Sequence, residues 1–434
     1  MELILENVRC FCGRHTIPTK PLTILVGENS SGKTTFLAML AIASSPWFPA
    51  QVSTSGPPYD LGSYDTIATN RGGKRGQLGS FSLGYSFGPP EEASHRFLLV
   101  KFTDNHGQAT ISSLEGKTAN VKLSCHISGT KLTGTVTYSE NSDVWDNARV
   151  HSFSSDIEEE LKQNIPIIFN IANTIATKVP PGKEPEEAKL RNKFGGAVWE
   201  LLSPRPFQSN VISLAPVRTK PRRTYDELSR EFRPEGDHIP AVLARLWEDE
   251  TAAQKKTFYD ALIEFGKDSG LFVDFDVKRL GKKSSSPFQI MVKTGGPSRN
   301  LQDVGYGVSQ VLPVFGDSVL TPKGSRLLLQ QPEVHLHPRA QAALGTLFSR
   351  LAASKHKQFV IETHSDYLLD RVRFEVAKGT IAPESVQILF FEKKKIEAKV
   401  HQLSLDQEGN LINPPSSYGS FFLTERNNLL FRAK

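Results

Sequence analysis

The stretch GENSSGKTT, residues 27–35, decides the fold class of this 434-residue chain. It matches the pattern G-x-x-x-x-G-K-[ST], with both glycines, the lysine and the first threonine in register. The apolar run TILV (23–26) precedes it, and TTFLAMLAIA (34–43) follows with apolar residues at helical spacing. A strand, a glycine-rich loop and a helix in this order predict a phosphate-binding P-loop. A chance glycine-rich turn explains this context less well.

The residue types in this loop suit the phosphates of a nucleotide. Consecutive backbone N–H groups at a helix N-terminus wrap the β- and γ-phosphates, Lys33 adds a positive charge, and the Thr34 hydroxyl can ligate Mg²⁺. The guanine-reading pattern N-K-x-D is absent, because NKFG (192–195) ends in glycine, so ATP is the expected nucleotide. The expected nucleotide-binding residues of the loop are Gly27, Asn29, Ser30, Ser31, Gly32, Lys33, Thr34 and Thr35.

Composition places the chain among ordinary globular proteins. Hydrophobic residues make up 38% and charged residues 23%, and the formal net charge of +6 leaves nucleic acid as a candidate partner without requiring it. The three cysteines form no C-x-x-C pair and no disulfide framework. The start MELILENVRC lacks the features of a signal peptide, and no stretch approaches eighteen uncharged apolar residues. We therefore expect a cytoplasmic protein without a membrane partner.

The texture of the sequence changes along the chain. Alternating runs from about 94 to 138 flank the turns DNHG and SGTK and predict two β-hairpins. Helical patterns follow after 150. Farther on, RLLLQQ (326–331) and QFVIE (358–362) are apolar runs on either side of an amphipathic stretch (338–353). Strand, helix and strand in this order predict a parallel α/β sheet.

Three later motifs follow the P-loop in a fixed order. They are GYGVSQ (305–310), QQPEVHLHP (330–338) and THSD (363–366). In order and spacing the chain resembles the AAA-type P-loop ATPases of the ABC, SMC, RecF and OLD kind, over roughly residues 1–45 and 295–370. Their EEPExHLHP is similar to QQPEVHLHP here, and GYGVSQ stands where their signature loop is expected.

The resemblance implies an α/β fold with an ABC-type (RecF/SMC-like) ATPase head. We expect four parts in the chain. They are the N-terminal part of the head with a β-hairpin subdomain (1–140), a helical insertion lobe (141–270), the C-terminal part of the head (271–370) and a small C-terminal module (371–434). The resemblance also implies a homodimer, or a higher homo-oligomer, in which ATP and Mg²⁺ are bound between two heads. Ser309 of one head would then contact the γ-phosphate bound by the other.

Two glutamines depart from the pattern of these ATPases. Gln330 aligns with the acid on the Mg²⁺ side and is the expected metal-side residue with Thr34, while Gln331 aligns with the catalytic glutamate. An amide oxygen orients a water or a metal shell, but it does not accept a proton near neutral pH. Glu333 is a candidate surrogate base, or alternatively a loop or interface residue. His364 is the expected sensor of the γ-phosphate.

Other groups in the chain admit two readings. His335 and His337 beside Glu333 suggest a metal site less strongly than a loop that shapes the end of the strand. Two basic clusters suit either a nucleic-acid backbone or solvated loops, and Arg218 alternatively reaches the nucleotide. The clusters are Arg218, Lys220, Arg222 and Arg223, and Lys278, Arg279, Lys282 and Lys283.

The residues after Asp366 bear on the expected function. Sixty-eight residues follow Asp366 without the D-x-D of a Toprim nuclease, and the tail resembles a β-rich module of standalone prokaryotic ATPases in antiphage defence operons. We therefore expect a slow ATPase that acts as sensor or scaffold beside a separate effector protein. The alternative is a RecF-like DNA repair clamp. A transporter ATPase fits the large insert less well.

Overall fold

The computed structural model describes residues 1–138, 149–156 and 210–419, apart from short gaps at 46–47, 50–51, 53, 73–75, 89–91, 93–94, 227–230, 249–252 and 355. The chain divides into two compact units. The first holds the described residues of 1–19, 30–209 and 393–399, and the second holds those of 20–29, 210–392 and 400–434.

The first unit is built on an eight-stranded antiparallel sheet. Strand β7 alternates buried and exposed side chains, as a strand with one solvated face does. The predicted hairpins are confirmed, and His106 and Gly107 both take positive φ in the two-residue turn between β5 and β6. In sheet order the strands are β2 (Phe11–Pro18), β1 (Glu2–Val8), β4 (Ser80–Phe87), β5 (Arg96–Asn105), β6 (Gln108–Lys117), β7 (Val121–Ser128), β8 (Lys131–Tyr138) and β9 (Arg149–Asp156). Helices α1 (Lys33–Ala43) and α2 (Tyr64–Ile67) belong to the same unit.

A seven-stranded sheet forms the second unit, and its first five strands run parallel. All residues of β3 and β14 are buried, as expected for strands covered on both faces. Strand β15 lies between the P-loop strand β3 and β14. The order is β10 (Val211–Leu214), β14 (Arg326–Gln330), β15 (Gln358–Glu362), β3 (Leu22–Gly27), β16 (Val386–Lys394), β17 (Glu397–Leu405) and β18 (Leu411–Ile412).

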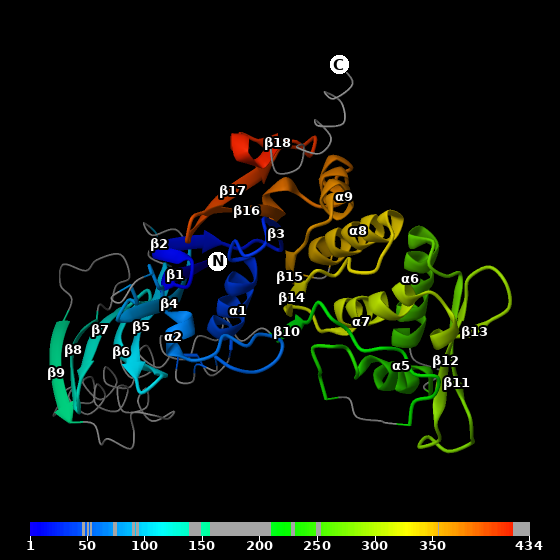
Figure 1. Ribbon diagram of the computed structural model, residues 1–434, viewed down its shortest axis with the longest axis horizontal. Helices are drawn as coiled ribbons and strands as arrows, with labels where there is room; N and C mark the ends of the chain where they lie inside the picture. The colour runs from blue at the N-terminus through cyan, green and yellow to red at the C-terminus, as the bar shows by residue number, and fades with distance from the viewer. Residues whose placement is uncertain are drawn as a thin grey trace, which may run out of the picture. The chain divides into compact units, whose positions relative to one another are not determined.

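Helices and a small sheet complete the second unit. Figure 1 shows α8 and α9 side by side, in agreement with their extensive packing. Phe315 of α7 packs against Phe258 and Phe265 of α6, with ring centroids 5.5 and 5.3 Å apart. The helices are α5 (Ile239–Glu248), α6 (Ala253–Ser269), α7 (Tyr306–Leu320), α8 (Pro338–Ser354) and α9 (Asp366–Ala377), with short 3₁₀ turns at Leu301–Asp303 and Pro383–Ser385. The small sheet contains β11 (Asp274–Arg279), β12 (Phe288–Lys293) and β13 (Arg299–Asn300).

The predicted subdivision of the chain stays a prediction. Within the expected helical lobe, α5 and α6 are helices, whereas 149–156 is the strand β9. Helical patterns also occur at 156–179 and 186–202 of the sequence, and apart from residue 156 they lie outside the described residues. In the expected C-terminal module, β16 pairs in parallel with the P-loop strand β3.

Candidate nucleotide site

The loop between β3 and α1 has the conformation that backbone N–H groups need to face an anion. Gly27, Ser30 and Gly32 take positive φ values of 139°, 59° and 104°. A Cβ on Gly27 would lie 2.2 Å from the carbonyl oxygen of Phe391, so only glycine fits there. Helix α1 starts at Lys33, where the backbone N–H of Phe36 donates to the Gly32 carbonyl at 2.9 Å.

The predicted loop residues differ in their exposure. Asn29, Ser30 and Thr34 are exposed, whereas Lys33 and Ser31 are buried. The Ser31 hydroxyl has no hydrogen-bond partner among the described residues. A buried hydroxyl without a partner is costly, so a bound group that accepts or donates a hydrogen bond there would stabilise the loop.

Three loops start at one edge of the parallel sheet. Gln330 of β14 is in register with Glu362 of β15, and Glu362 is in register with Leu25 of β3. The carboxyl ends of these strands therefore carry the start of the P-loop, the two glutamines and the THSD segment. Ligands of open α/β sheets bind at this edge. Glu362 is a buried carboxylate that sequence reasoning missed, although it ends the apolar run FVIE.

Gln331 is held in an unusual backbone conformation directly after β14. Its φ of 41° lies in the left-handed region, which is sparsely populated for residues with a side chain. The backbone N–H of Gln331 donates to the Glu362 carbonyl at 2.8 Å. Its own carbonyl accepts a hydrogen bond from Nη2 of Arg218 at 3.2 Å. Two partners therefore fix the backbone of Gln331 directly after β14.

Glu333 connects the loop after β14 to the loop after β15. Oε1 of this buried carboxyl accepts a hydrogen bond from the backbone N–H of His364 at 2.8 Å, whereas Oε2 has no partner among the described residues. Burial raises the pKa of Glu333, although the His364 N–H and the charge of Arg218 act in the opposite direction. The His364 side chain is exposed. Such a carboxyl is suited to accepting a proton, because its basicity is higher than that of a solvated glutamate.

The residues present fit a magnesium ion only weakly. The side-chain Nε2 of Gln330 is buried without a hydrogen-bond partner among the described residues, but an amide N–H donates and does not ligate a cation, so only the Oε1 atom of this side chain could hold the metal. Glu362, which is in register with Gln330, would supply a hard oxygen ligand of the kind that Mg²⁺ prefers. His335 and His337 are exposed, and no group of three or more His, Cys, Asp or Glu among the described residues has the arrangement of a metal site.

The signature segment forms the first turn of α7. The Ser309 hydroxyl donates to the Tyr306 carbonyl at 2.8 Å, and the exposed ring of Tyr306 lies 5.1 Å from that of His335. The GYGVSQ and HLHP segments therefore meet within one chain.

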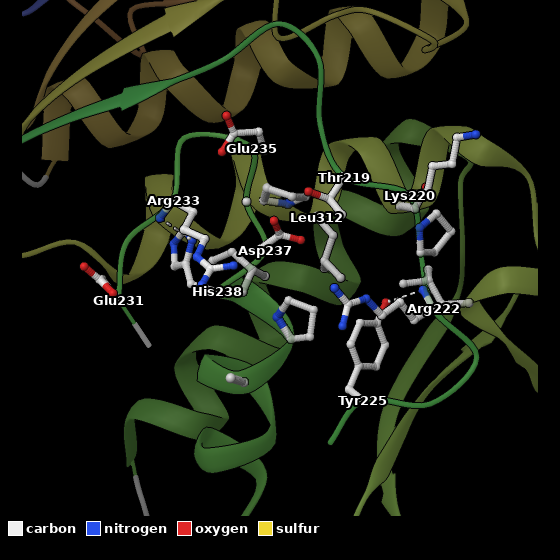
Figure 2. A pocket seen from close by; sticks show the side chains of 18 residues that line it. Thr219, Lys220, Arg222, Tyr225, Glu231, Arg233, Glu235, Asp237, His238 and Leu312 are labelled. Carbon is white, nitrogen blue, oxygen red and sulfur yellow. Dashed lines mark hydrogen bonds between the residues drawn. The ribbon is translucent and has the colours of Figure 1, made fainter. Parts of the chain in front are cut away.

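Figure 2 shows a pocket lined by α7, by the start of α5 and by loop residues that include Thr219, Tyr225 and Asp237. Ser309, Leu312 and Pro313 are its lining residues on α7. A molecule bound in this pocket would contact α7, the helix that begins within the GYGVSQ segment.

Several residues of the basic clusters have partners within the protein. Arg223 pairs with Asp303, and Arg279 pairs with Glu248. Arg218 is buried at the end of the sheet and is not part of a surface patch. The exposed members are Lys220, Arg222, Arg223, Lys278, Lys282 and Lys283.

A family model described as "AAA ATPase domain" matches residues 1–369 of this chain. The chain belongs to the AAA ATPase domain family. As a member of this family it is a P-loop ATPase, and the predicted α/β fold of a P-loop ATPase is confirmed by this match together with the strand order.

Solved structures similar to this ATPase include three SMC heads. An SMC head bound to the C-terminal winged-helix domain of ScpA shares 11% identity, with 94% of this chain and 98% of that chain covered and a TM-score of 0.43. The SMC head from Thermotoga maritima shares 12% identity, with 92% and 97% covered and a TM-score of 0.37. The head from Pyrococcus furiosus with an extended coiled coil, bound to the C-terminal domain of ScpA, shares 12% identity, with 93% and 96% covered and a TM-score of 0.39.

No curated protein matches this AAA ATPase. None of the helices in the described part of the chain combines the length and hydropathy that crossing a bilayer requires.

Proposed function

We propose that this ATPase binds ATP with Mg²⁺, hydrolyses it slowly and dimerises around it, as the sensor or scaffold subunit of a prokaryotic antiphage defence system with a separate effector. The slow hydrolysis is inferred from the residues at the end of β14. Two amides, Gln330 and Gln331, occupy the positions of the metal-side acid and the catalytic acid. The antiphage role is supported by the resemblance of the C-terminal residues to a β-rich module of standalone prokaryotic ATPases in antiphage defence operons.

Glu333 is the candidate base for the residual turnover. Its Oε2 is unpartnered among the described residues, and burial raises its pKa. A water between this oxygen and the γ-phosphate would pass its proton to Glu333 during attack. The other oxygen is already engaged by the His364 N–H, and the residue stands two positions beyond the usual one. Both features make Glu333 a less well-placed base and account for a slow reaction.

The bound ATP would close the dimer. Ser309 lies in the first turn of α7 and is itself 5% exposed, whereas the Tyr306 ring beside it is 40% exposed. We assign this end of α7 to the surface that meets the nucleotide of the second copy. The closed form then persists until hydrolysis or a trigger redistributes the states. The pocket beneath Ser309 gives a trigger molecule a place to act on α7.

The pH dependence of turnover tests the role of Glu333. Only the ionised carboxylate accepts a proton, so kcat falls as the pH falls through the pKa of Glu333. Because burial raises this pKa, the fall occurs at a higher pH than for an ordinary glutamate near about 4.3. We expect this acid limb in kcat measured between roughly pH 4.5 and 9, and its loss in Glu333→Gln. An unchanged limb in the variant would assign it to another group, such as His364.

Assembly is the second expectation for solution experiments. With ATP and Mg²⁺ at roughly 50 µM protein, light scattering should give the mass of a dimer or of a multiple of it. Lys33→Ala should show no nucleotide-dependent increase. Strict monomers of the wild type in ATP would contradict the proposed dimer and the role of Ser309.

A RecF-like clamp on DNA is the alternative function. The exposed basic residues Lys220, Arg222, Lys278, Lys282 and Lys283 favour it. Stimulation of ATP turnover by duplex DNA, together with binding that weakens steeply with salt, would support the clamp. Insensitivity of turnover to DNA would favour the sensor.

A further inference from the structure

Arg218 is a buried cation at the nucleotide edge of the sheet. It lies four residues after the end of β10, whose Leu214 is in register with Leu329 of β14. Its side chain is 3% exposed, whereas Lys220, Arg222 and Arg223 in the same segment are exposed. The chain therefore removes one arginine of this basic run from water and places it in contact with the backbone of Gln331.

Most donors of this guanidinium are unused. Nη2 donates to the Gln331 carbonyl at 3.2 Å, but Nε and Nη1 are buried without any hydrogen-bond partner in the described part of the chain. Burial lowers the pKa of Arg218 to about 10, and the charge of Glu333 opposes this shift. The group therefore remains positively charged at neutral pH. A buried positive group with two open N–H donors calls for an anion.

Glu333 does not fill this need within the structure. The charges of Glu333 and Arg218 act on each other, yet no ion pair joins the two side chains, both of which the structure describes. Oε2 of Glu333 is unpartnered as well. Two opposite charges, each with open hydrogen-bonding capacity, leave a place for a third group at the end of β14.

We propose that Arg218 binds the terminal phosphate of the ATP held by its own chain and thereby distinguishes ATP from ADP. The inference rests on the nucleotide site of the proposed function. Guanidinium N–H groups match phosphate oxygens in geometry and charge. In P-loop ATPases the residues after the strand corresponding to β14 face the γ-phosphate, which the P-loop and its lysine contact from their own side. A cation at this position contacts the phosphate that ADP lacks.

The test compares two nucleotides in matched variants. The affinities of ATPγS and ADP are measured by calorimetry for wild type, Arg218→Met and Arg223→Met. Arg218→Met should weaken ATPγS by about 10- to 100-fold and change ADP by less than about threefold. Arg223→Met, which alters an exposed arginine of the same segment, should change neither affinity.

A purely structural arginine would give a different result. Loss of the Gln331 contact alone would weaken both nucleotides equally or neither, and either outcome overturns the inference. If Arg218→Met does not fold by circular dichroism, Arg218→Lys is used, and the ratio of ADP to ATPγS dissociation constants should still fall. An unchanged ratio in that variant also overturns the inference.

A failure of the proposed nucleotide site itself would give a different result. Wild-type protein that binds neither nucleotide, or binding that Lys33→Ala leaves unchanged, would overturn the proposed function together with this inference. Binding that depends on Lys33 with an unaltered ratio in Arg218→Met would overturn only the role of Arg218.

Discussion

Lys33→Ala is expected to remove most of the ATP affinity. Lys33 is the first residue of α1, its side chain is 3% exposed, and the glycine-rich loop before it takes the positive φ values of a phosphate cradle. Loss of one charge-assisted contact to a phosphate costs about 3 kcal/mol, which corresponds to roughly 100-fold in affinity. Calorimetry with ATPγS measures this loss directly.

A matched control keeps the Lys33 experiment specific. Lys323→Ala removes an exposed lysine from the loop between α7 and β14 and should leave the affinity unchanged. Equal binding by wild type and Lys33→Ala would contradict the assignment of this loop to the nucleotide.

Glu333→Gln is expected to reduce turnover by about 10²- to 10⁴-fold, the usual loss when a positioned base is removed. The amide has nearly the same shape as the carboxyl, and its oxygen still accepts the hydrogen bond from the His364 N–H. The loop geometry should therefore survive, and ATP binding should change little. Phosphate release under single-turnover conditions measures the chemical step.

The contrary result for Glu333 is equally informative. Unchanged turnover in Glu333→Gln, with ATP affinity intact, would restrict the residue to holding the backbone of the THSD segment. Glu384→Gln serves as the control, because Glu384 lies in the short 3₁₀ turn before β16, away from the carboxyl ends of the strands.

The sequence was sufficient to predict the parallel core and the hairpins. The runs that became β3, β14 and β15 are apolar and uninterrupted because these strands are buried, and the glycine-rich loop marks the start of α1. Hairpin turns such as His106–Gly107 are equally local. These features depend on neighbours along the chain.

Pairing between distant segments could not be read in the same way. Glu362 became part of the candidate site because β15 is in register with β14, which places it beside Gln330. Arg218 stands in a run of basic residues that is typical of a solvated loop, yet it is buried and donates to the carbonyl of Gln331, which lies 113 residues farther along the chain. The hydrogen bond between Glu333 and His364 likewise joins loops 31 residues apart.

The pair of glutamines gives the account its central claim, namely that this chain is an ATPase by fold with a slow cycle. Gln330 and Gln331 supply neither the negative charge nor the proton acceptor of two carboxylates, and in the proposed function Glu333 replaces them imperfectly. A slow cycle suits a sensor that rests in the ATP-bound form.

Steady-state phosphate release by wild type and Gln331→Glu, measured side by side, tests this claim most directly. The account predicts slow release by the wild type, well below a typical enzyme rate of about 10 s⁻¹, and faster release by Gln331→Glu because a carboxylate then stands at the catalytic position. Wild-type turnover of many per second, with no gain in Gln331→Glu, would contradict it.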